Sequence, residues 1–261
     1  MSQAIVGDRR GERPTLVDRA LSARCWTASV SWLVPWTGTL TALQSTLGAE
    51  RVDVLSRAFC RGLVAATGSR WKKHVDPAVD PNEPYVFAQN HINHFDFVSM
   101  YPATPHFKQG VELETHFKYP VYGVFMRTRG TIPVPADRSG RLEAVREGMR
   151  RVRAKGQSVL AFPEGTRTLD GRVGPFRKGI FVAARDLGMK VVPTAVTGMY
   201  DVMRKGSLII RPGRTVRVYC EAPVDFAGVS DEELPDRIEA VRSAIVRRVE
   251  EDVVRQHGER A

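Results

Sequence analysis

The sequence predicts an α/β fold in which a mostly parallel or mixed sheet is flanked by helices and preceded by an N-terminal helical motif. After about residue 84, short apolar runs of strand length alternate with amphipathic stretches that have the period of a helix. Before it, an uncharged segment with three tryptophans and a further amphipathic stretch indicate helices. A chain of 261 residues suits one large domain, or one domain with an appendage.

The N-terminal segment at residues 25–49 has no charged residue and contains three tryptophans. Its many Ser and Thr residues argue against a full membrane crossing, which needs about 20 predominantly apolar residues. Pro35 and Gly38 are expected to divide the segment into two short helices. Two alternatives remain for these helices: an interfacial, monotopic attachment to a membrane, or a helical hairpin packed on the domain.

The remaining elements follow in order along the chain. A third helix is expected at about 52–66, followed by a polar connector at 72–84. Strands are expected at 85–88, near Phe107, and at 132–134, 158–162, 191–196, 208–211 and 215–220. Helices are expected after Phe95, at 140–155, at 179–187 and from Leu234 onward. We therefore expect an N-terminal helical, membrane-associating motif with its connector at 1–80 and a catalytic domain at 81–261.

The charge of the chain favours anionic partners. Its formal net charge is +10 and its pI is near 9.9, which suits phosphorylated substrates, acidic lipid surfaces or nucleic acid. Neither a P-loop nor a G-x-G-x-x-G motif occurs, so nucleotide motors and dinucleotide-binding enzymes lose support. The basic stretch at 141–155 is either a solvated helix face or a docking surface for anionic headgroups or an acidic carrier protein.

The cysteines and the N-terminus predict the compartment. Cys25, Cys60 and Cys220 are odd in number and far apart, which suits reduced thiols better than a disulfide framework. The first twenty residues are rich in charge and contain no apolar stretch of the kind found in signal peptides. We therefore expect the chain on the cytoplasmic side.

A cluster of polar side chains at residues 90–96 directly follows the expected strand at 85–88. His91 and Asp96 are five positions apart, about 140° around an ideal helix, so they can meet only if His91 lies on a turn and Asp96 in the following helix. There, the carboxylate would hold one ring nitrogen of His91 and leave the other free to take a proton from a hydroxyl. No G-x-S-x-G elbow occurs, so the attacking hydroxyl is expected from a substrate.

Two other interpretations use the same residues. His91 could cap a helix, with Asp96 as a solvated carboxylate at the helix N-terminus. Alternatively, His91, His94 and Asp96 could bind a metal ion, although their His-x-x-His-x-Asp spacing differs from the His-x-His-x-Asp-His of metallo-β-lactamase-like hydrolases.

Four sequence blocks occur in a definite order. They are residues 90–96, Gly130-Thr131-Ile132-Pro133-Val134, Phe162-Pro163-Glu164-Gly165-Thr166-Arg167 and Val191-Val192-Pro193-Thr194. Together they resemble the glycerophosphate and lysophosphatidate acyltransferase family over about residues 84–200. The resemblance implies a glycerophosphate-acyltransferase-like αβ domain and direct acyl transfer from a thioester to a glycerol-type hydroxyl. His91 would be the general base and Asp96 its orienting partner.

The resemblance also implies which groups take part in the reaction. No metal, cofactor or covalent acyl-enzyme is expected, and acyl-CoA or an acyl carrier protein thioester is the co-substrate. Glu164, Gly165, Thr166 and Arg167 match the acceptor-binding residues of the family. A glycine turn exposes N–H groups, a threonine adds a hydroxyl, and an arginine pairs bidentately with phosphate. Glu164 is expected to hold a glycerol hydroxyl, to anchor Arg167, or to form an ordinary loop salt bridge.

The second block departs from the family pattern. Relatives follow the Gly-x-Ile turn with an aromatic residue and then Asp-Arg or Arg, whereas residues 133–136 intervene here before Asp137 and Arg138. Arg138 remains a candidate phosphate ligand, with Arg127 and Arg129 as alternatives. Lys178 also matches a family-like run, near a helix N-terminus suited to anions.

The sequence thus predicts an acyltransferase of phospholipid synthesis that converts lysophosphatidate to phosphatidate. The expected partners are an acyl thioester, a glycerophosphate or lysophospholipid acceptor and an anionic membrane surface, with no nucleic acid. The protein is expected on the cytoplasmic face of the membrane, peripheral or monotopic. The alternatives are acylation of glycerol 3-phosphate or another lysolipid, a basic membrane-binding protein without activity, and a metal-dependent hydrolase.

Overall fold

The structure, a computed structural model, describes residues 14–120, 122–137 and 139–258. Within them, the strands are β1 (Arg70–Val75), β2 (Val86–Gln89), β3 (Lys108–Leu113), β4 (Ile132–Val134), β5 (Ser158–Ala161), β6 (Val191–Thr197) and β7 (Thr215–Cys220). The helices are α1 (Leu16–Leu47), α2 (Asp53–Ala66), α3 (Asp96–Met100), α4 (Tyr122–Arg129), α5 (Arg141–Ala154), α6 (Gly179–Asp186), α7 (Met199–Val202) and α8 (Leu234–Gly258), with 3-10 turns η1 (Tyr101–Ala103) and η2 (Glu114–Lys118).

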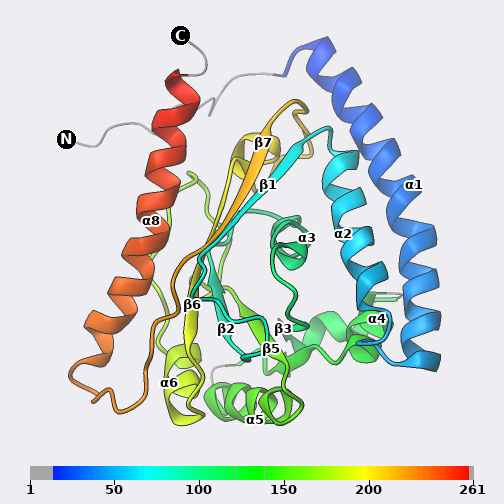
Figure 1. Cartoon of the computed structure of the whole chain (residues 1–261). Helices are drawn as coiled ribbons and strands as arrows, with labels where there is room; N and C mark the ends of the chain where they lie inside the picture. Colours follow the sequence, from blue (N-terminus) through cyan, green and yellow to red (C-terminus); the bar gives the residue numbers. More distant parts are fainter. Residues whose placement is uncertain (1–13, 121, 138, 259–261) are drawn as a thin grey trace.

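The strands form one sheet in the order β1-β7-β6-β2-β5-β3-β4 (Figure 1). Neighbouring strands are parallel except β6 and β7, which pair antiparallel. The prediction of an α/β fold whose sheet becomes mixed toward its end is therefore confirmed. Because β2, β5 and β6 are parallel, their carboxyl ends meet at one edge of the sheet, where open α/β folds bind ligands.

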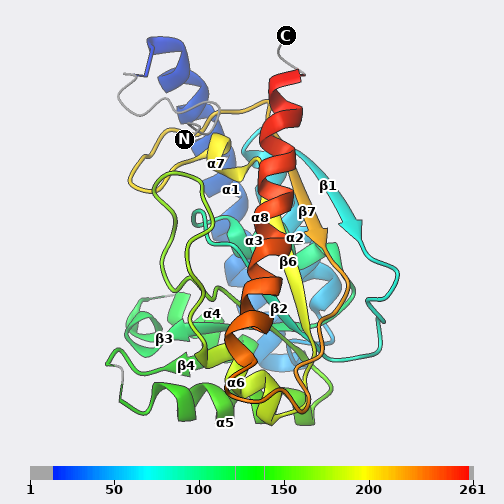
Figure 2. The ribbon, with the colours of Figure 1, turned by 90° about the vertical axis from the view of Figure 1, so that its left-hand side faces the viewer.

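Helices cover both faces of the sheet. At β2 and the residue before it, Tyr85 and Phe87 pack toward α1, α2 and α3, whereas Val86 and Ala88 pack toward α5, α6 and α8. This alternation explains why the strand is an unbroken apolar run, since a strand buried on both faces needs apolar side chains at every position. Figure 2 shows α8 lying lengthwise across the sheet, in front of β6.

The N-terminal helix α1 differs from the prediction of two short helices, because it continues through Pro35. A proline inside a helix costs about 3 kcal/mol. Packing of α1 on the domain outweighs this cost. Before Pro35, the Trp26 indole donates to the Leu208 carbonyl at 2.7 Å and the Trp32 indole donates to the Phe59 carbonyl at 2.9 Å; after it, Leu40 is fully buried. The hairpin of α1 and α2 therefore packs on the domain, one of the two alternatives considered. Among the described helices, none is long and apolar enough to cross a membrane.

Three local predictions were wrong. The polar stretch at 70–75 lacks an apolar strand signal, yet it forms the edge strand β1, so the sheet begins before the expected boundary at residues 80 and 81. The segment 208–211 is not a strand, because its backbone bonds to α1 instead: the Ser22 hydroxyl donates to the Leu208 carbonyl and accepts from the Ile210 N–H. Helix α4, which carries a glycine and two arginines within eight residues, was not predicted at all.

Candidate active site

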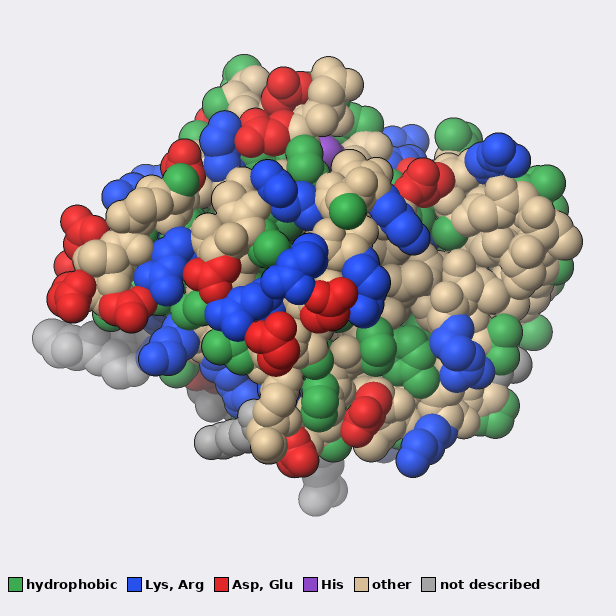
Figure 3. Space-filling model, turned by 90° about the horizontal axis from the view of Figure 1, so that it is seen from below, with side chains coloured by type: hydrophobic (Ala, Val, Ile, Leu, Met, Phe, Trp, Pro, Cys, Tyr) green, Lys and Arg blue, Asp and Glu red, His purple; other side chains and the backbone are tan. Residues whose placement is uncertain are grey.

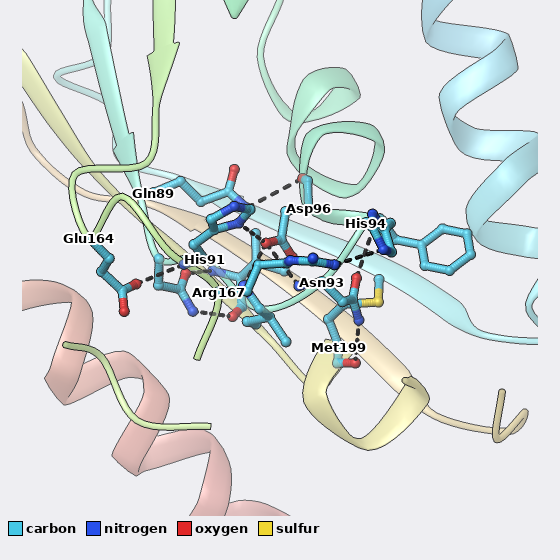
Figure 4. A network of polar contacts seen from close by, with 12 residues as sticks. Gln89, His91, Asn93, His94, Asp96, Glu164, Arg167 and Met199 are labelled. Carbon is cyan, nitrogen blue, oxygen red and sulfur yellow. Dashed lines mark hydrogen bonds and ion pairs between the residues drawn. The ribbon is translucent and has the colours of Figure 1, made fainter. Parts of the chain in front are cut away.

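The candidate site lies where β2 and β5 end, at the carboxyl edge of the sheet. The Asn90 side chain continues the pairing of β2 with β6, because its amide donates to the Val196 carbonyl at 3.0 Å and accepts from the Val196 N–H at 2.8 Å. Asn93 fixes the far side of the turn by donating to the carbonyls of Met199 and Met203. The turn that carries His91 is therefore held to the sheet by buried amides (Figure 4).

His91 and Asp96 meet as the sequence predicts. His91 lies on the turn and Asp96 is the first residue of α3, and Nδ1 of His91 lies 2.7 Å from Oδ2 of Asp96. The same carboxylate oxygen accepts the backbone N–H groups of Ile92 at 2.5 Å and Asn93 at 3.1 Å. Nε2 of His91 has no hydrogen-bond partner within the described residues. It is therefore free to act on a substrate.

Burial controls the electrostatics of the pair. The Asp96 side chain is 1% exposed and that of His91 is 24% exposed. Burial raises the pKa of Asp96, while the hydrogen bonds from His91 and from the backbone of Ile92 and Asn93 oppose that rise. The His91 ring also stacks on Phe162, with centroids 4.3 Å apart. Its orientation is thus fixed on one side by a carboxylate and on a face by an aromatic ring.

Glu164 is a buried bridge between two loops. Its Oε1 accepts the backbone N–H of His91 at 2.8 Å, and its Oε2 accepts the backbone N–H of Gly174 at 2.8 Å. Burial raises the pKa of Glu164, and these two hydrogen bonds oppose the rise. An ion pair between Glu164 and Arg167, one of the alternatives considered for Glu164, is not found within the described residues. Glu164 instead ties the loop after β5 to the backbone of the His91 turn.

Gly165, Thr166 and Arg167 follow on the exposed side of the same loop. Gly165 has a φ of +67°, in the left-handed region that favours glycine, and a Cβ there would lie 2.8 Å from the Arg177 guanidinium carbon. The Thr166 hydroxyl accepts from the Lys205 ammonium at 3.2 Å, which also donates to the Arg167 carbonyl at 2.9 Å. Lys205 was not predicted from the sequence, because it is an isolated residue after α7 and belongs to no recognisable motif.

The Arg167 side chain reaches His94 rather than Glu164. Its Nη1 lies 2.7 Å from Nε2 of His94 (Figure 4). Since a guanidinium can only donate, Nε2 of His94 must accept, so the ring is neutral in this contact. Burial, followed by the charge of Arg167, lowers the pKa of His94.

The geometry does not assemble the metal site considered from the sequence. His94 turns its Nε2 to Arg167, while His91 turns its Nδ1 to Asp96. Within residues 14–258 as described, no three His, Cys, Asp or Glu side chains form a group that could hold a metal ion.

The remaining candidate phosphate ligands lie elsewhere. Arg138 lies outside the described residues. Lys178 lines a hollow of about 620 Å³ together with Phe176 and Asp231, and no residue of the His91 network lines that hollow. Arg129 is buried, with its guanidinium 4.3 Å from the centroid of Tyr101, and donates to the Lys108 carbonyl. Arg127 lies in the last turn of α4 and donates to the Phe117 carbonyl.

Fold and site together define an α/β domain of the acyltransferase type, with a histidine–aspartate pair beside a basic loop at the carboxyl edge of the sheet. A family model described as Acyltransferase matches residues 70–197, about half of the chain. The resemblance inferred from the four sequence blocks is thereby confirmed.

Curated relatives and a solved structure agree with this family. A chloroplastic 1-acyl-sn-glycerol-3-phosphate acyltransferase of Brassica napus is 34% identical over 142 residues, which are 54% of this chain and 41% of the relative. Its counterpart in Arabidopsis thaliana is 33% identical over 54% of this chain and 39% of its own length. The chain thus spans about two fifths of these relatives' length. The crystal structure of an acyltransferase from Thermotoga maritima shares the fold, with a TM-score of 0.75, 22% identity and coverage of 90% of this chain and 95% of its own.

Proposed function

We propose that the chain transfers a fatty acyl group from an acyl thioester to the free hydroxyl of lysophosphatidate, giving phosphatidate. The observation that carries this proposal is the buried contact of His91 with Asp96. It leaves Nε2 of His91 without a partner among the described residues, beside the loop of Arg167. The names of the curated relatives support the same acceptor. Acylation of glycerol 3-phosphate or of another lysolipid is the alternative within this chemistry.

The mechanism follows from the tautomer of His91. Its Nδ1–H donates to Asp96, so Nε2 takes the proton of the acceptor hydroxyl while that oxygen attacks the thioester carbonyl. Asp96 stabilises the imidazolium that forms. When the tetrahedral intermediate collapses, the carbon–sulfur bond breaks and the proton on Nε2 passes to the departing thiolate. The products are the ester and the free thiol, and neither a metal ion nor a covalent acyl-enzyme takes part.

The acceptor phosphate is assigned to the loop after β5. Arg167 offers a planar fork, Thr166 a hydroxyl and Gly165 a backbone N–H on the exposed side of the loop. Lys205, which contacts Thr166 and Arg167, adds a second cation next to them. Glu164 supports the site through the backbone of His91 rather than by contacting the acceptor.

The hairpin at the N-terminal side is assigned to membrane attachment. Several of its large apolar side chains are exposed, including Val34 at 64% and Val54 at 76%. Such residues on a basic protein favour peripheral or monotopic binding to an anionic surface, which we place on the cytoplasmic face of the membrane. Residues 1–80 would supply this attachment and residues 81–261 the catalytic residues, with β1 joined to the sheet of the second part.

One experiment tests the reaction. Purified protein is incubated with acyl-CoA or with an acyl carrier protein thioester, in the presence of lysophosphatidate, glycerol 3-phosphate or other lysolipids, and the products are identified by mass spectrometry. Formation of phosphatidate with release of free thiol supports the proposal. Binding of lysophosphatidate without any product would favour the basic binding protein, and hydrolysis of the thioester without an ester product would favour a hydrolase.

A further inference from the structure

A second hollow lies at the opposite edge of the sheet from His91. Its volume is about 710 Å³, and its walls come from the turn between α1 and α2, the end of α4, the residues before β4 and the last turns of α5. Gln109 and Gln157 line it at the amino ends of β3 and β5, whereas His91 follows the carboxyl end of β2. Since these strands are parallel, the hollow is separate from the His91 site.

The hollow is lined by cations. Arg51, Arg127, Arg151 and Lys155 line it at its surface, whereas its one carboxylate, Glu50, is engaged by the side-chain amide of Gln157. Arg151 lies in the last turn of α5, and Lys155, four positions further on, is the C-cap residue of that helix, so the two side chains lie on one side of its end. An anion entering the hollow would therefore meet positive charge from α5, from the end of α4 and from the turn after α1.

Two of these cations have no partner in the part of the chain that the structure describes. The side chains of Arg51 and Lys155 make no hydrogen bond or ion pair within the described residues. The outer face of α5 is different, because Arg146 binds Asp186 and Glu143, and Arg150 binds Glu147. Figure 3, seen from this end of the molecule, shows blue and red side chains intermixed. The charges of the outer face are thus largely neutralised. In the hollow, Arg151 contacts Glu147 at 3.5 Å, whereas Arg51 and Lys155 have no such partner among the described residues.

We propose that this hollow binds the phosphate of an anionic phospholipid headgroup. Its position supports a lipid, because Leu47, which lines the hollow, is 49% exposed, and Val54 of the adjoining α2 is 76% exposed. These side chains belong to the hairpin that we assign to membrane attachment, and the inference rests on that assignment. An apolar rim that enters the bilayer would bring the cations to the level of the headgroups, where each lysine or arginine strengthens binding.

The test measures binding to vesicles by sedimentation, using the full chain. One set of vesicles is phosphatidylcholine alone, one contains phosphatidate, and one contains phosphatidylglycerol adjusted to the same surface potential. The unsubstituted protein should bind both kinds of anionic vesicle more tightly than vesicles of phosphatidylcholine alone. Lys155→Gln and Arg51→Gln should each weaken binding to phosphatidate about fivefold, the usual contribution of one cation at an anionic surface, and leave binding to phosphatidylcholine unchanged.

Arg153→Gln is the matched control. Arg153 is exposed on the same helix but does not line the hollow, and it lies toward Gly188. Its loss removes the same charge, so binding to phosphatidate should change by less than about twofold. An equal loss for Arg153→Gln and Lys155→Gln would overturn the site in favour of general surface charge.

The remaining outcomes separate the hollow from the hairpin and from soluble ligands. Failure of the protein to bind any vesicle would contradict the membrane attachment, and with it this inference, but not the acyl transfer measured in detergent. Tight binding to phosphatidylcholine with no preference for phosphatidate would overturn the hollow alone. Inorganic phosphate or coenzyme A is titrated separately. If either binds in a way that depends on Lys155, and the protein shows no preference among the vesicles, the anion bound in the hollow is a soluble molecule and the lipid assignment is wrong.

Discussion

The Arg167 guanidinium donates to Nε2 of His94 at 2.7 Å, so a residue of the His91 turn holds the cation assigned to the acceptor phosphate. The two residues come from the loops after β5 and β2. The contact gives His94 a positioning role, where the sequence had suggested only metal binding. A neutral His94 leaves Arg167 as the charged member of the pair.

Arg167→Ala should raise the KM for lysophosphatidate by roughly ten- to a hundredfold, since a charged hydrogen bond contributes about 1.5–3 kcal/mol. His94→Ala removes only the hydrogen bond that positions Arg167. Its KM should rise about two- to tenfold, with kcat nearly unchanged. Steady-state kinetics with varied acceptor measures both, after circular dichroism has shown that each variant is folded. An unchanged KM for Arg167→Ala would remove that residue from the site.

Glu164→Ala should reduce both stability and kcat. It leaves the backbone N–H groups of His91 and Gly174 without their acceptor, which costs about 1–3 kcal/mol for each group that stays buried and unpaired. The His91 turn loses its tie to the loop after β5, so proton transfer slows while the acceptor KM changes little. Urea unfolding and steady-state kinetics measure the two effects. A raised KM with unchanged unfolding free energy would mean that Glu164 contacts the acceptor instead.

How far the sequence predicts this molecule depends on the range of the interactions involved. The pair of His91 and Asp96 was predictable because both residues lie within one turn and its helix. β1 was not, because its polar residues form a strand only through pairing with β7. Lys205 was not either, since the fold alone brings it to Thr166.

The contacts of Glu164 also depend on distant segments. A carboxylate three positions from an arginine suggests an ion pair, but the fold presents the backbone N–H groups of His91 and Gly174 to this carboxylate instead. Likewise, a proline in residues 25–49 predicts a break in the helix, while the long-range packing of Trp26 and Trp32 keeps the helix continuous. Local chemistry was thus predicted, and contacts between distant segments were not.

Acidification should destabilise the fold partly through His106. This side chain is 6% exposed, its Nε2 donates to the Asp80 carbonyl at 2.9 Å, and burial lowers its pKa below the usual value near 6.5. Between that lowered pKa and about pH 6.5, the unfolded chain binds more protons than the folded one, so stability falls as the pH falls. His106→Gln lacks this titration. Its Tm should fall less between pH 7 and pH 5 than that of the unsubstituted protein; an equal fall would contradict the assignment.

Membrane attachment is best tested on the surface of the hairpin. Deleting residues 21–66 would also remove Phe59, Leu63 and Val64 from the core and unfold the domain. Val34→Asp combined with Val54→Asp changes only exposed positions, so the unfolding free energy should stay within about 0.5 kcal/mol. Binding to phosphatidylcholine vesicles should be strongly reduced. Leu208→Asp, at an exposed position outside the hairpin, is the control that should bind normally. Full vesicle binding by the double variant would show that the hairpin is not the attachment surface.

The catalytic assignment makes the sharpest prediction, because it separates a general base from a metal ligand. His91→Ala removes proton abstraction from the acceptor hydroxyl, an effect usually worth about 10²–10⁴-fold in rate. Asp96→Asn should also be costly, since an amide cannot stabilise the imidazolium and can select the wrong tautomer of His91. His94→Ala should lose far less, because His94 acts only through Arg167. A chelator should leave the activity of all four proteins, the unsubstituted one included, unchanged.

If three ligands held a metal ion, His91, His94 and Asp96 would all be needed, and chelation would abolish activity reversibly. Acyl transfer is therefore measured with and without chelator; comparable losses at His91 and His94 together with chelator sensitivity would overturn the mechanism.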